Sequence, residues 1–246
     1  MSEPRFDLEQ VFDEDYLYFY ESALADERSD AETEVIWQLV GLEAGMDLLD
    51  LGCGHGRIAN RLAARGCRVT GLDATPLFLE RARADAAERG VEVEYVEGDM
   101  RVLRWSDRFD GVLLWFTTFG YFGDDDNRRV LTEAHRALRP GGRLAIELHN
   151  RDVYVRRLLP FTAMERDGNL MVDRHQFDIH TGRTYSERFV VRDGRVRRAD
   201  YSVRFFTFTE LRDWLLAAGF ERVDGYDSGG GELTSETRRM VVVGTR

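Results

Sequence analysis

A short apolar run that ends in a glycine-rich turn constrains the fold of this sequence most. Residues 47–51 read DLLDL, then Gly52-Cys53-Gly54-His55-Gly56 follows, and an amphipathic pattern continues to Arg65. The change of period predicts a strand, a tight turn and a helix. Because glycine has no side chain, such a turn lets a ligand approach the backbone at a helix N-terminus.

The same alternation of patterns continues through the middle of the chain. Strands are predicted at 67–72, 91–96, 110–116 and 143–148, a helix after Thr75-Pro76 that ends at Gly90, and another over about 125–138. Arg139-Pro140-Gly141-Gly142 is predicted to be a turn before the last of these strands. Repeated βα units of this length predict an α/β fold, with a parallel sheet covered by helices on both faces.

The segments before and after this region do not show the same alternation of strand and helix patterns. Residues 1–27 are acidic and aromatic and predict a short helix or lid, and Ser29 to Glu32 form a capping-box pattern for a helix to about Leu42. Asp-Gly and Thr-Gly pairs at 167, 181 and 193 predict antiparallel hairpins, before a helix at 209–218 and strands at 220–225 and 239–244. We therefore expect an N-terminal helical cap (1–45), a core (46–160 and 207–246) and an inserted antiparallel meander (161–206).

Composition narrows the classes of partner. A net charge of -11 opposes binding to nucleic-acid phosphates. No apolar run is long enough to span a membrane, the first ten residues lack the features of a signal peptide, and Cys53 and Cys67 are not in a metal or redox spacing. The expectation is a soluble cytoplasmic protein without nucleic-acid or membrane partners. Residues 151–204 are rich in arginine, so a local site for an anionic substrate stays open as an alternative.

The chemistry of the glycine turn distinguishes between nucleotide ligands. The third glycine comes one position earlier than in a G-x-G-x-x-G dinucleotide fingerprint, and Asp50 directly precedes the turn. A carboxylate there would repel a pyrophosphate, but it suits the α-ammonium group of a methionine moiety, whose carboxylate the helix amides would suit. Asp73, at the end of the second predicted strand, is placed to accept hydrogen bonds from ribose hydroxyls.

From about Met46 to His149 the sequence resembles the class I S-adenosylmethionine-dependent methyltransferases. LLDLGCGHGRIA, VTGLDATPLFLERAR, VEYVEGDMRVLRW and FDGVLLWFTTFGYF are similar to four motifs of that family in their order, and ALRPGGRLAIE to the stretch before its fifth strand. The resemblance implies a Rossmann-like fold with a mostly parallel seven-stranded sheet. It also implies S-adenosylmethionine as the cofactor and S-adenosylhomocysteine as the product.

The resemblance also implies which residues hold the cofactor. Asp50, Gly52 and Gly54 would bind its methionine end and Asp73 its ribose, while Asp99 and the Met100 amide would bind adenine. Trp115 and Phe116 would line the sulfonium. The full set of expected cofactor contacts is Tyr20, Asp50, Gly52, Cys53, Gly54, Asp73, Ala74, Asp99, Met100, Trp115 and Phe116.

Two residues are candidates for catalysis. His149, after the predicted strand 143–148, would face the cofactor cleft as a base or an acceptor-orienting group, or it would hydrogen-bond in the following turn. Tyr121 is the second candidate, with packing as its alternative. Tyr16 and Tyr20 would cover the site or belong to the core. Cys53 is expected to fill space, His55 to be solvated, and Gly56 to serve helix packing.

Further motifs bear on whether the protein binds a metal ion and on its class of substrate. Asp124-Asp125-Asp126-Asn127 could bind magnesium, but it suits the start of a helix better, and no metal is expected. The tetrad Asn/Asp-Pro-Pro-Tyr/Phe of base- and amide-methylating enzymes is replaced by residues 115–119, WFTTF. The meander is similar to that of deoxyamino-sugar N-methyltransferases and related tailoring enzymes, in which it forms part of the substrate pocket or a dimer interface.

The sequence thus predicts methyl transfer to an oxygen or nitrogen of a small-molecule metabolite, with secondary-metabolite tailoring as one setting. Homodimer and monomer both stay open. A nicotinamide-dependent oxidoreductase and a binding module without turnover are the alternatives.

Overall fold

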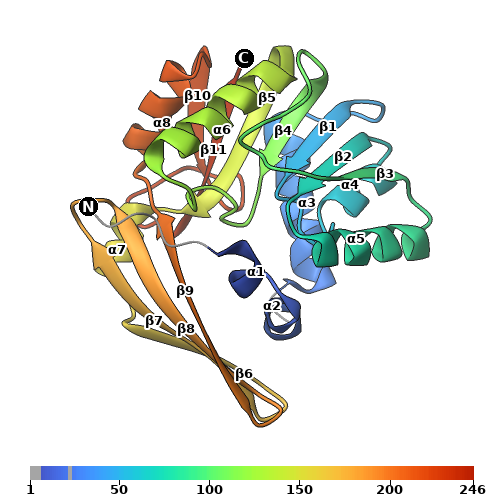
Figure 1. Cartoon of the computed structure of the whole chain (residues 1–246). Helices are drawn as coiled ribbons and strands as arrows, with labels where there is room; N and C mark the ends of the chain where they lie inside the picture. Colours follow the sequence, from blue (N-terminus) through green and yellow to red (C-terminus); the bar gives the residue numbers. More distant parts are fainter. Residues whose placement is uncertain (1–6, 22–23) are drawn as a thin grey trace.

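Two β-sheets of different kinds organise the computed structural model, which describes residues 7–21 and 24–246 (Figure 1). The larger sheet has seven strands in the order β10-β11-β5-β4-β1-β2-β3, and only β11 runs antiparallel to its neighbours. Its strands are β1 (Asp47–Leu51), β2 (Arg68–Asp73), β3 (Val93–Glu97), β4 (Phe109–Leu114), β5 (Leu138–His149), β10 (Arg222–Asp227) and β11 (Arg239–Thr245). The mostly parallel α/β sheet expected from the sequence is confirmed.

Helices cover both faces of this sheet because its central strands are apolar on both sides. The helices of the core are α3 (Asp26–Val40), α4 (Ala59–Ala64), α5 (Pro76–Arg89), α6 (Asp124–Ala137) and α8 (Phe208–Ala217). In β1, Leu49 packs with α6 and α8, whereas its neighbour Leu48 packs with α3 and α4. No helix within 7–21 or 24–246 is long and apolar enough to cross a membrane.

Three predicted boundaries were wrong. Helix α3 begins at Asp26, so Ser29 lies inside the helix and donates to the Leu24 carbonyl instead of capping it. The acidic residues of its first turn favour the earlier start, because they interact well with the helix dipole. Strand β4 ends at Leu114, before two residues with positive φ. Strand β5 begins at Leu138, so the predicted 139–142 turn lies within the strand, where its register with β4 shifts.

The smaller sheet is an antiparallel meander of β6 (Phe161–Arg166), β7 (Asn169–Asp178), β8 (Arg183–Arg192) and β9 (Arg195–Arg204), preceded by α7 (Arg151–Arg156). The β6–β7 and β8–β9 hairpins turn at the predicted Asp-Gly pairs, where both residues have positive φ, and the β7–β8 hairpin turns at the predicted Thr181-Gly182 pair, where only Gly182 does. The antiparallel insert expected from the sequence is therefore confirmed.

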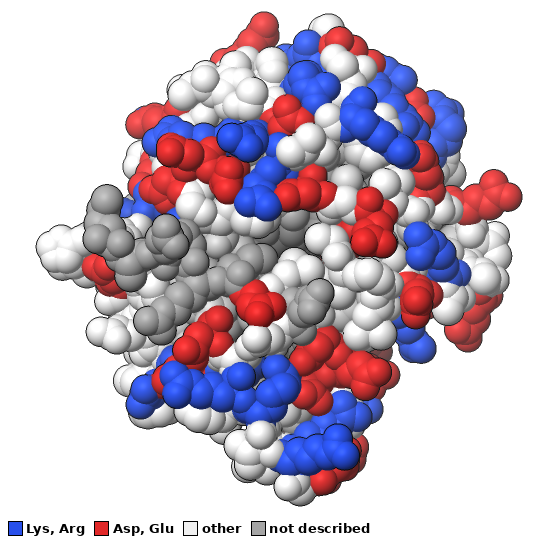
Figure 2. Space-filling model, viewed as in Figure 1, with Lys and Arg blue, Asp and Glu red and all other residues white. Residues whose placement is uncertain are grey.

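The acidic N-terminal segment packs on this arginine-rich sheet. Helices α1 (Leu8–Val11) and α2 (Glu14–Tyr20) lie between the two sheets in Figure 1. Asp15 pairs with Arg192 at 3.0 Å and with Arg197 at 3.1 Å, and Phe19 is buried with Met171. Acidic and basic side chains are interspersed on the face shown in Figure 2. Ion pairs between the N-terminal segment and the meander therefore neutralise part of the uneven charge of the sequence.

Candidate active site

A cavity of about 710 Å³ lies where the carboxyl ends of the parallel strands face the meander. One side is lined by the glycine turn and the loops after β2, β3 and β4, and the other by residues of β6 to β9. Residues of α1 and α2 also line it. Every residue that the sequence analysis proposed for cofactor binding or catalysis lies on this one cavity.

The glycine turn is shaped by close contacts. Gly52 and Gly54 have positive φ, and a Cβ on Gly52 would lie 2.1 Å from the Thr118 side chain. A Cβ on Gly56 would lie 2.2 Å from the Tyr95 hydroxyl, so Gly56 serves packing. Side chains are thus excluded on the cavity side of the turn and beneath it.

The turn does not offer its amides to a ligand as the sequence suggested. The amides of Gly52 and Cys53 donate to the Leu72 carbonyl, that of Gly54 to the Asp73 carboxylate at 2.8 Å, and that of Gly56 to the Cys53 carbonyl. These four turn amides therefore leave no donor for the methionine carboxylate, and the expectation that helix amides hold it stays a prediction. The turn is folded around its own hydrogen bonds.

Two carboxylates beside the turn are buried. Burial raises the pKa of Asp50 to about 7, with the charge of Asp73 adding to the shift and that of Arg57 opposing it. Asp73 accepts hydrogen bonds from the amides of Gly54 and Thr75, both at 2.8 Å, which orient its oxygens. A buried acid at Asp50 fits a cationic group of a ligand, because the cation would stabilise the ionised form.

The other two residues of the turn, Cys53 and His55, have uncharged side chains with a structural role. Burial raises the pKa of the Cys53 thiol well above its ordinary value, which suits the expected space-filling role. His55 is half-buried, not solvated as expected, and burial lowers its pKa to about 4. Both side chains line the cavity in uncharged form at neutral pH.

Asp99 is held by an arginine that the sequence analysis did not consider. Arg101 donates to Asp99 Oδ1 at 3.0 Å, to Asp99 Oδ2 at 2.6 Å and to Asp126 at 2.9 Å, and its guanidinium lies 4.5 Å from the centre of the Phe122 ring. This pairing lowers the pKa of Asp99, so its carboxylate stays ionised. The 124–126 run forms the acidic first turn of α6, and Asp124 pairs with Arg183.

The segment after β4 contains two strained residues. Phe116 and Thr117 have φ of 64° and 59°, which is rare without glycine. Buried Glu147 accepts from the Phe116 amide at 3.0 Å, and Arg239 donates to the Thr117 hydroxyl at 2.7 Å and also pairs with Glu147. This pair was not predicted from the sequence, although the charged Glu147 inside the apolar run LAIEL was a signal.

His149 also belongs to this group. Arg239 lies 2.9 Å from His149 Nε2, and burial together with the Arg239 charge lowers the pKa of the imidazole to about 3. Because a guanidinium can only donate, Nε2 must be the acceptor. The imidazole packs against Tyr154 and Phe205 at 5.6 and 5.5 Å between ring centres. Its Nε2 lone pair is thus already used within the protein.

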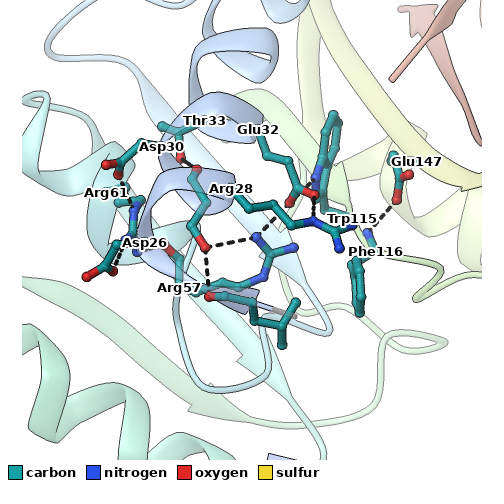
Figure 3. Close-up of polar contacts among 12 residues, drawn as sticks. Asp26, Arg28, Asp30, Glu32, Thr33, Arg57, Arg61, Trp115, Phe116 and Glu147 are labelled. Atoms are coloured by element: carbon teal, nitrogen blue, oxygen red, sulfur yellow. Dashed lines mark hydrogen bonds and ion pairs between the residues drawn. The ribbon is translucent and has the colours of Figure 1, made fainter. Parts of the chain in front are cut away.

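Aromatic side chains close the cofactor side. Tyr16 and Tyr20 stack at 4.4 Å between ring centres, and Phe12 contacts both Tyr16 and Tyr121 edge to face. Burial raises the pKa of Tyr121, so its hydroxyl stays protonated. Trp115 donates to Glu32 of α3 at 3.1 Å, and Figure 3 shows it beside Phe116.

The inner face of the meander carries paired polar groups. Arg188 forms two bonds of 2.8 Å to Asp173, and Tyr201 donates to Asp173 at 3.1 Å. His175 lies 2.8 Å from the Ser186 hydroxyl and 2.9 Å from that of Thr162. Since alternate residues of a strand share a face, Asp173 and His175 point to the same side of β7. None of these residues was predicted from the sequence.

Comparison with known proteins agrees with this geometry. Residues 48–142 match the family described as "Methyltransferase domain". A demethylmenaquinone methyltransferase of Thermus thermophilus is 37% identical over 142 residues, which cover 52% of this chain and 63% of that relative, less than two thirds of its length.

Two solved structures share the fold over nearly the whole chain. The CcbJ methyltransferase from Streptomyces caelestis has a TM-score of 0.82 and 24% identity and covers 97% of this chain and 98% of its own. CalS10 with bound S-adenosylmethionine, an amino pentose methyltransferase from Micromonospora echinaspora, has a TM-score of 0.66 and 24% identity, with coverage of 98% and 100%. The expected Rossmann-like architecture, including the meander, is therefore confirmed.

Proposed function

Because this chain is an S-adenosylmethionine-dependent methyltransferase, we propose that it methylates a nitrogen or oxygen atom of a small molecule bound against the meander. The observation that carries this proposal is the single cavity of about 710 Å³, which joins the glycine turn to the inner face of β7 to β9. Its volume falls in the range of small-molecule sites. One wall would hold the cofactor and the other the acceptor.

The residues around the glycine turn fit this cofactor. Asp50 would bind the α-ammonium, oriented Asp73 the ribose hydroxyls, and Asp99 with the Met100 amide the adenine, while Cys53, Gly54 and Ala74 would border the nucleoside. Tyr20, Trp115 and Phe116 would exclude water around the sulfonium. When bound, S-adenosylmethionine supplies an electrophilic methyl group. The protein then has to align the acceptor with it, which can contribute roughly 7 to 11 kcal/mol.

The meander would supply the acceptor site. Its charged groups lie in the Asp173–Arg188 pair, and its other polar groups belong to Tyr201, Ser186 and His175. A wall of paired charges and hydroxyls suits an uncharged polar group better than an anion. The open alternative of an anionic substrate is therefore disfavoured by this wall.

The acid-base chemistry of the cavity favours a nitrogen acceptor. Nε2 of His149 accepts from Arg239, both ring nitrogens of His175 contact hydroxyls, and Asp173 is paired with Arg188. A general base is needed where the acceptor carries a proton of high pKa, as an alcohol does. A neutral amine attacks with its own lone pair and loses its proton afterwards. We therefore rank an amine above a hydroxyl group and give His149 an orienting role rather than that of a base.

Transfer of a radiolabelled methyl group to matched acceptors tests this function. Cyclohexylamine and cyclohexanol, and benzylamine and benzyl alcohol, differ only in the nucleophilic atom. We expect label in the amines, at a rate that rises with pH as the ammonium form loses its proton. Label in the alcohols alone would contradict the nitrogen preference, and failure to bind both S-adenosylmethionine and S-adenosylhomocysteine would contradict the function.

The setting of the enzyme is part of the same proposal. The net charge of -11 supports a small-molecule acceptor rather than nucleic acid. We place the enzyme in the cytoplasm, as expected from a sequence with two cysteines in no metal or redox spacing. A homodimer would use the outer face of the meander, where Phe161, Leu170, Val191 and Val196 are exposed. Light scattering coupled to size exclusion would give a dimer mass, and replacing Val196 with Arg would then reduce it to that of a monomer.

A further inference from the structure

The turn after β4 lies at the centre of the seven-stranded sheet. Strands β1 and β4 are neighbours there, and the helices that follow them, α4 and α6, pack on opposite faces. In sheets of this kind, ligands bind in the crevice beyond the carboxyl ends of two such strands. Residues 115–118 line the cavity at this point, and a Cβ on Gly52 would lie 2.1 Å from the Thr118 side chain. The turn after β4 therefore rests directly on the glycine turn.

Two residues of this turn have a backbone conformation that their side chains disfavour. Phe116 and Thr117 are both left-handed, with φ of 64° and 59°. For Thr117 this is a clear outlier, because its side chain is branched at Cβ. Such strain persists only where the surrounding groups hold it, and it is concentrated at functional sites. Some part of the fold must therefore stabilise the turn.

A buried carboxylate and a guanidinium supply that stabilisation. Glu147 of β5 accepts from the Phe116 amide with its side chain and from the Thr117 amide with its backbone carbonyl, both at 3.0 Å, and Figure 3 shows it beside Phe116. Arg239 of β11 donates to the Thr117 hydroxyl at 2.7 Å and to Glu147 at 2.6 Å, and it lies 2.9 Å from His149 Nε2. Both amides of the strained turn are thus held by one strand, and the neighbouring strand holds its hydroxyl group.

We propose that Glu147 and Arg239 are positioning residues for methyl transfer, which keep the turn after β4 left-handed and thereby keep the methyl donor and the acceptor aligned. The turn contacts the glycine turn through Thr118 and is joined to His149 through Arg239. If it relaxed, the surface between the two halves of the cavity would move, while the groups that bind each reactant would stay in place. A misplacement of about 1 Å can cost roughly 100-fold in rate. This inference depends on the proposed function only for the choice of acceptor.

Two variants weaken the Glu147–Arg239 pair to different degrees. Glu147→Gln keeps the shape of the side chain but removes its charge, and Thr117→Val removes only the hydroxyl group that Arg239 binds. We expect kcat to fall roughly 10- to 100-fold in Glu147→Gln and about three- to tenfold in Thr117→Val. The KM for the acceptor and the Kd for S-adenosylhomocysteine should change by less than about threefold, because alignment and not binding is lost.

Arg139 provides a matched control on β5. It joins the carboxylates of Asp47 and Asp110 at 2.9 and 2.8 Å, at the opposite end of β1 and β4, and it is not among the described residues that line the cavity. Arg139→Met thus removes an arginine that links neighbouring strands of the same sheet, and it should leave kcat unchanged.

Rescue by glycine distinguishes a held backbone from a general effect on stability. Glycine adopts a left-handed conformation without a steric penalty. Adding Thr117→Gly to Glu147→Gln should therefore raise kcat at least about threefold above that of Glu147→Gln alone. The same substitution in the otherwise unaltered protein should not raise kcat.

Hydrogen exchange measured by NMR gives a result that needs no acceptor. The amides of Phe116 and Thr117 should exchange at least about tenfold faster in Glu147→Gln than in the unaltered protein, and at unchanged rates in Arg139→Met. The amide of Val112, inside β4, is the internal reference and should keep its rate in both variants.

The outcomes separate this inference from the proposed function. Failure to bind S-adenosylmethionine and S-adenosylhomocysteine would contradict the function, and the exchange rates would still test whether Glu147 holds the turn. Unchanged exchange or unchanged kcat in Glu147→Gln would overturn the positioning role. A loss of kcat that is matched by an equal loss of affinity for S-adenosylhomocysteine, or that Thr117→Gly does not relieve, would also overturn it, because the effect would then be general.

Discussion

The two walls of the cavity treat buried charge in opposite ways. On the side of the seven-stranded sheet, burial raises the pKa values of Asp50 and Asp73, and backbone amides orient the Asp73 carboxylate. On the meander side, Asp173 is neutralised by Arg188 at two contacts of 2.8 Å. The first wall is therefore prepared for a ligand that carries its own charge, and the second for an uncharged acceptor. We therefore assign cofactor binding to the seven-stranded sheet and acceptor binding to the meander.

Removing the Asp173–Arg188 ion pair of the meander should cause the largest change, a loss of folding stability. Asp173→Ala leaves Arg188 buried without its counter-ion, which should lower the free energy of unfolding by about 3 to 5 kcal/mol. Urea unfolding followed by circular dichroism measures this. Glu165→Ala, at an exposed position of β6, is the control and should change stability by less than about 0.5 kcal/mol. Equal stability of the two variants would show that the pair is not needed to hold the wall.

Replacing an aspartate with alanine on the opposite wall, formed by the seven-stranded sheet, should weaken ligand binding. Asp73→Ala should weaken the affinity for S-adenosylhomocysteine by about tenfold or more, since two charge-assisted bonds to the ribose are lost. Calorimetric titration checks this, with Asp173→Ala as the comparison in conditions where it is folded. Asp173→Ala should bind S-adenosylhomocysteine with nearly unchanged affinity. Unchanged affinity in Asp73→Ala would refute the ribose assignment.

A pH titration should sharpen the contrast. The pKa of Asp50 in the ligand-free protein is about 7, above its ordinary 3.8, so its folded state holds the proton more tightly. Its contribution to stability is therefore lost as pH rises from about 3.8 to 7. Binding of an ammonium needs the ionised form, so cofactor affinity should rise about tenfold from pH 6 to pH 8. Asp50→Asn should abolish this dependence, and a parallel slope in that variant would assign it to another group.

The smallest change, a modest loss of turnover, is expected for a substitution of His149, at the junction of the two walls. His149→Asn keeps an acceptor for Arg239, so turnover should fall by less than about tenfold. The pH-rate profile should keep its shape, because the imidazole is uncharged above a pKa of about 3. A loss of several orders of magnitude, with cofactor affinity intact, would restore His149 as the general base. Steady-state kinetics with whichever of the matched amines accepts the labelled methyl group would supply the measurement.

Much of the cofactor wall could be predicted because its residues are local in sequence. Asp50, the glycine turn and Asp73 follow directly from two strand ends, and the carboxyl ends of parallel strands meet at one edge. The meander could also be predicted, from its Asp-Gly turns. The roles of its inner-face residues could not be predicted, since the sequence pattern of β7 and β8 does not indicate which ligand faces them. Ser29 was misread as a cap because the acidic residues before it were not weighed.

The sequence alone determined the order of strands and helices, the glycine turn and the cofactor family, since these depend on neighbours within a few residues. Only the tertiary structure decided which donors remain available. The amides of Gly52, Cys53, Gly54 and Gly56 are used within the protein, His149 is bound to Arg239 of β11, and Nη2 of Arg57 has no hydrogen-bond partner within 7–21 and 24–246. These facts depend on contacts between residues far apart in the chain, where burial makes each unpaired polar atom costly. No local pattern records such contacts.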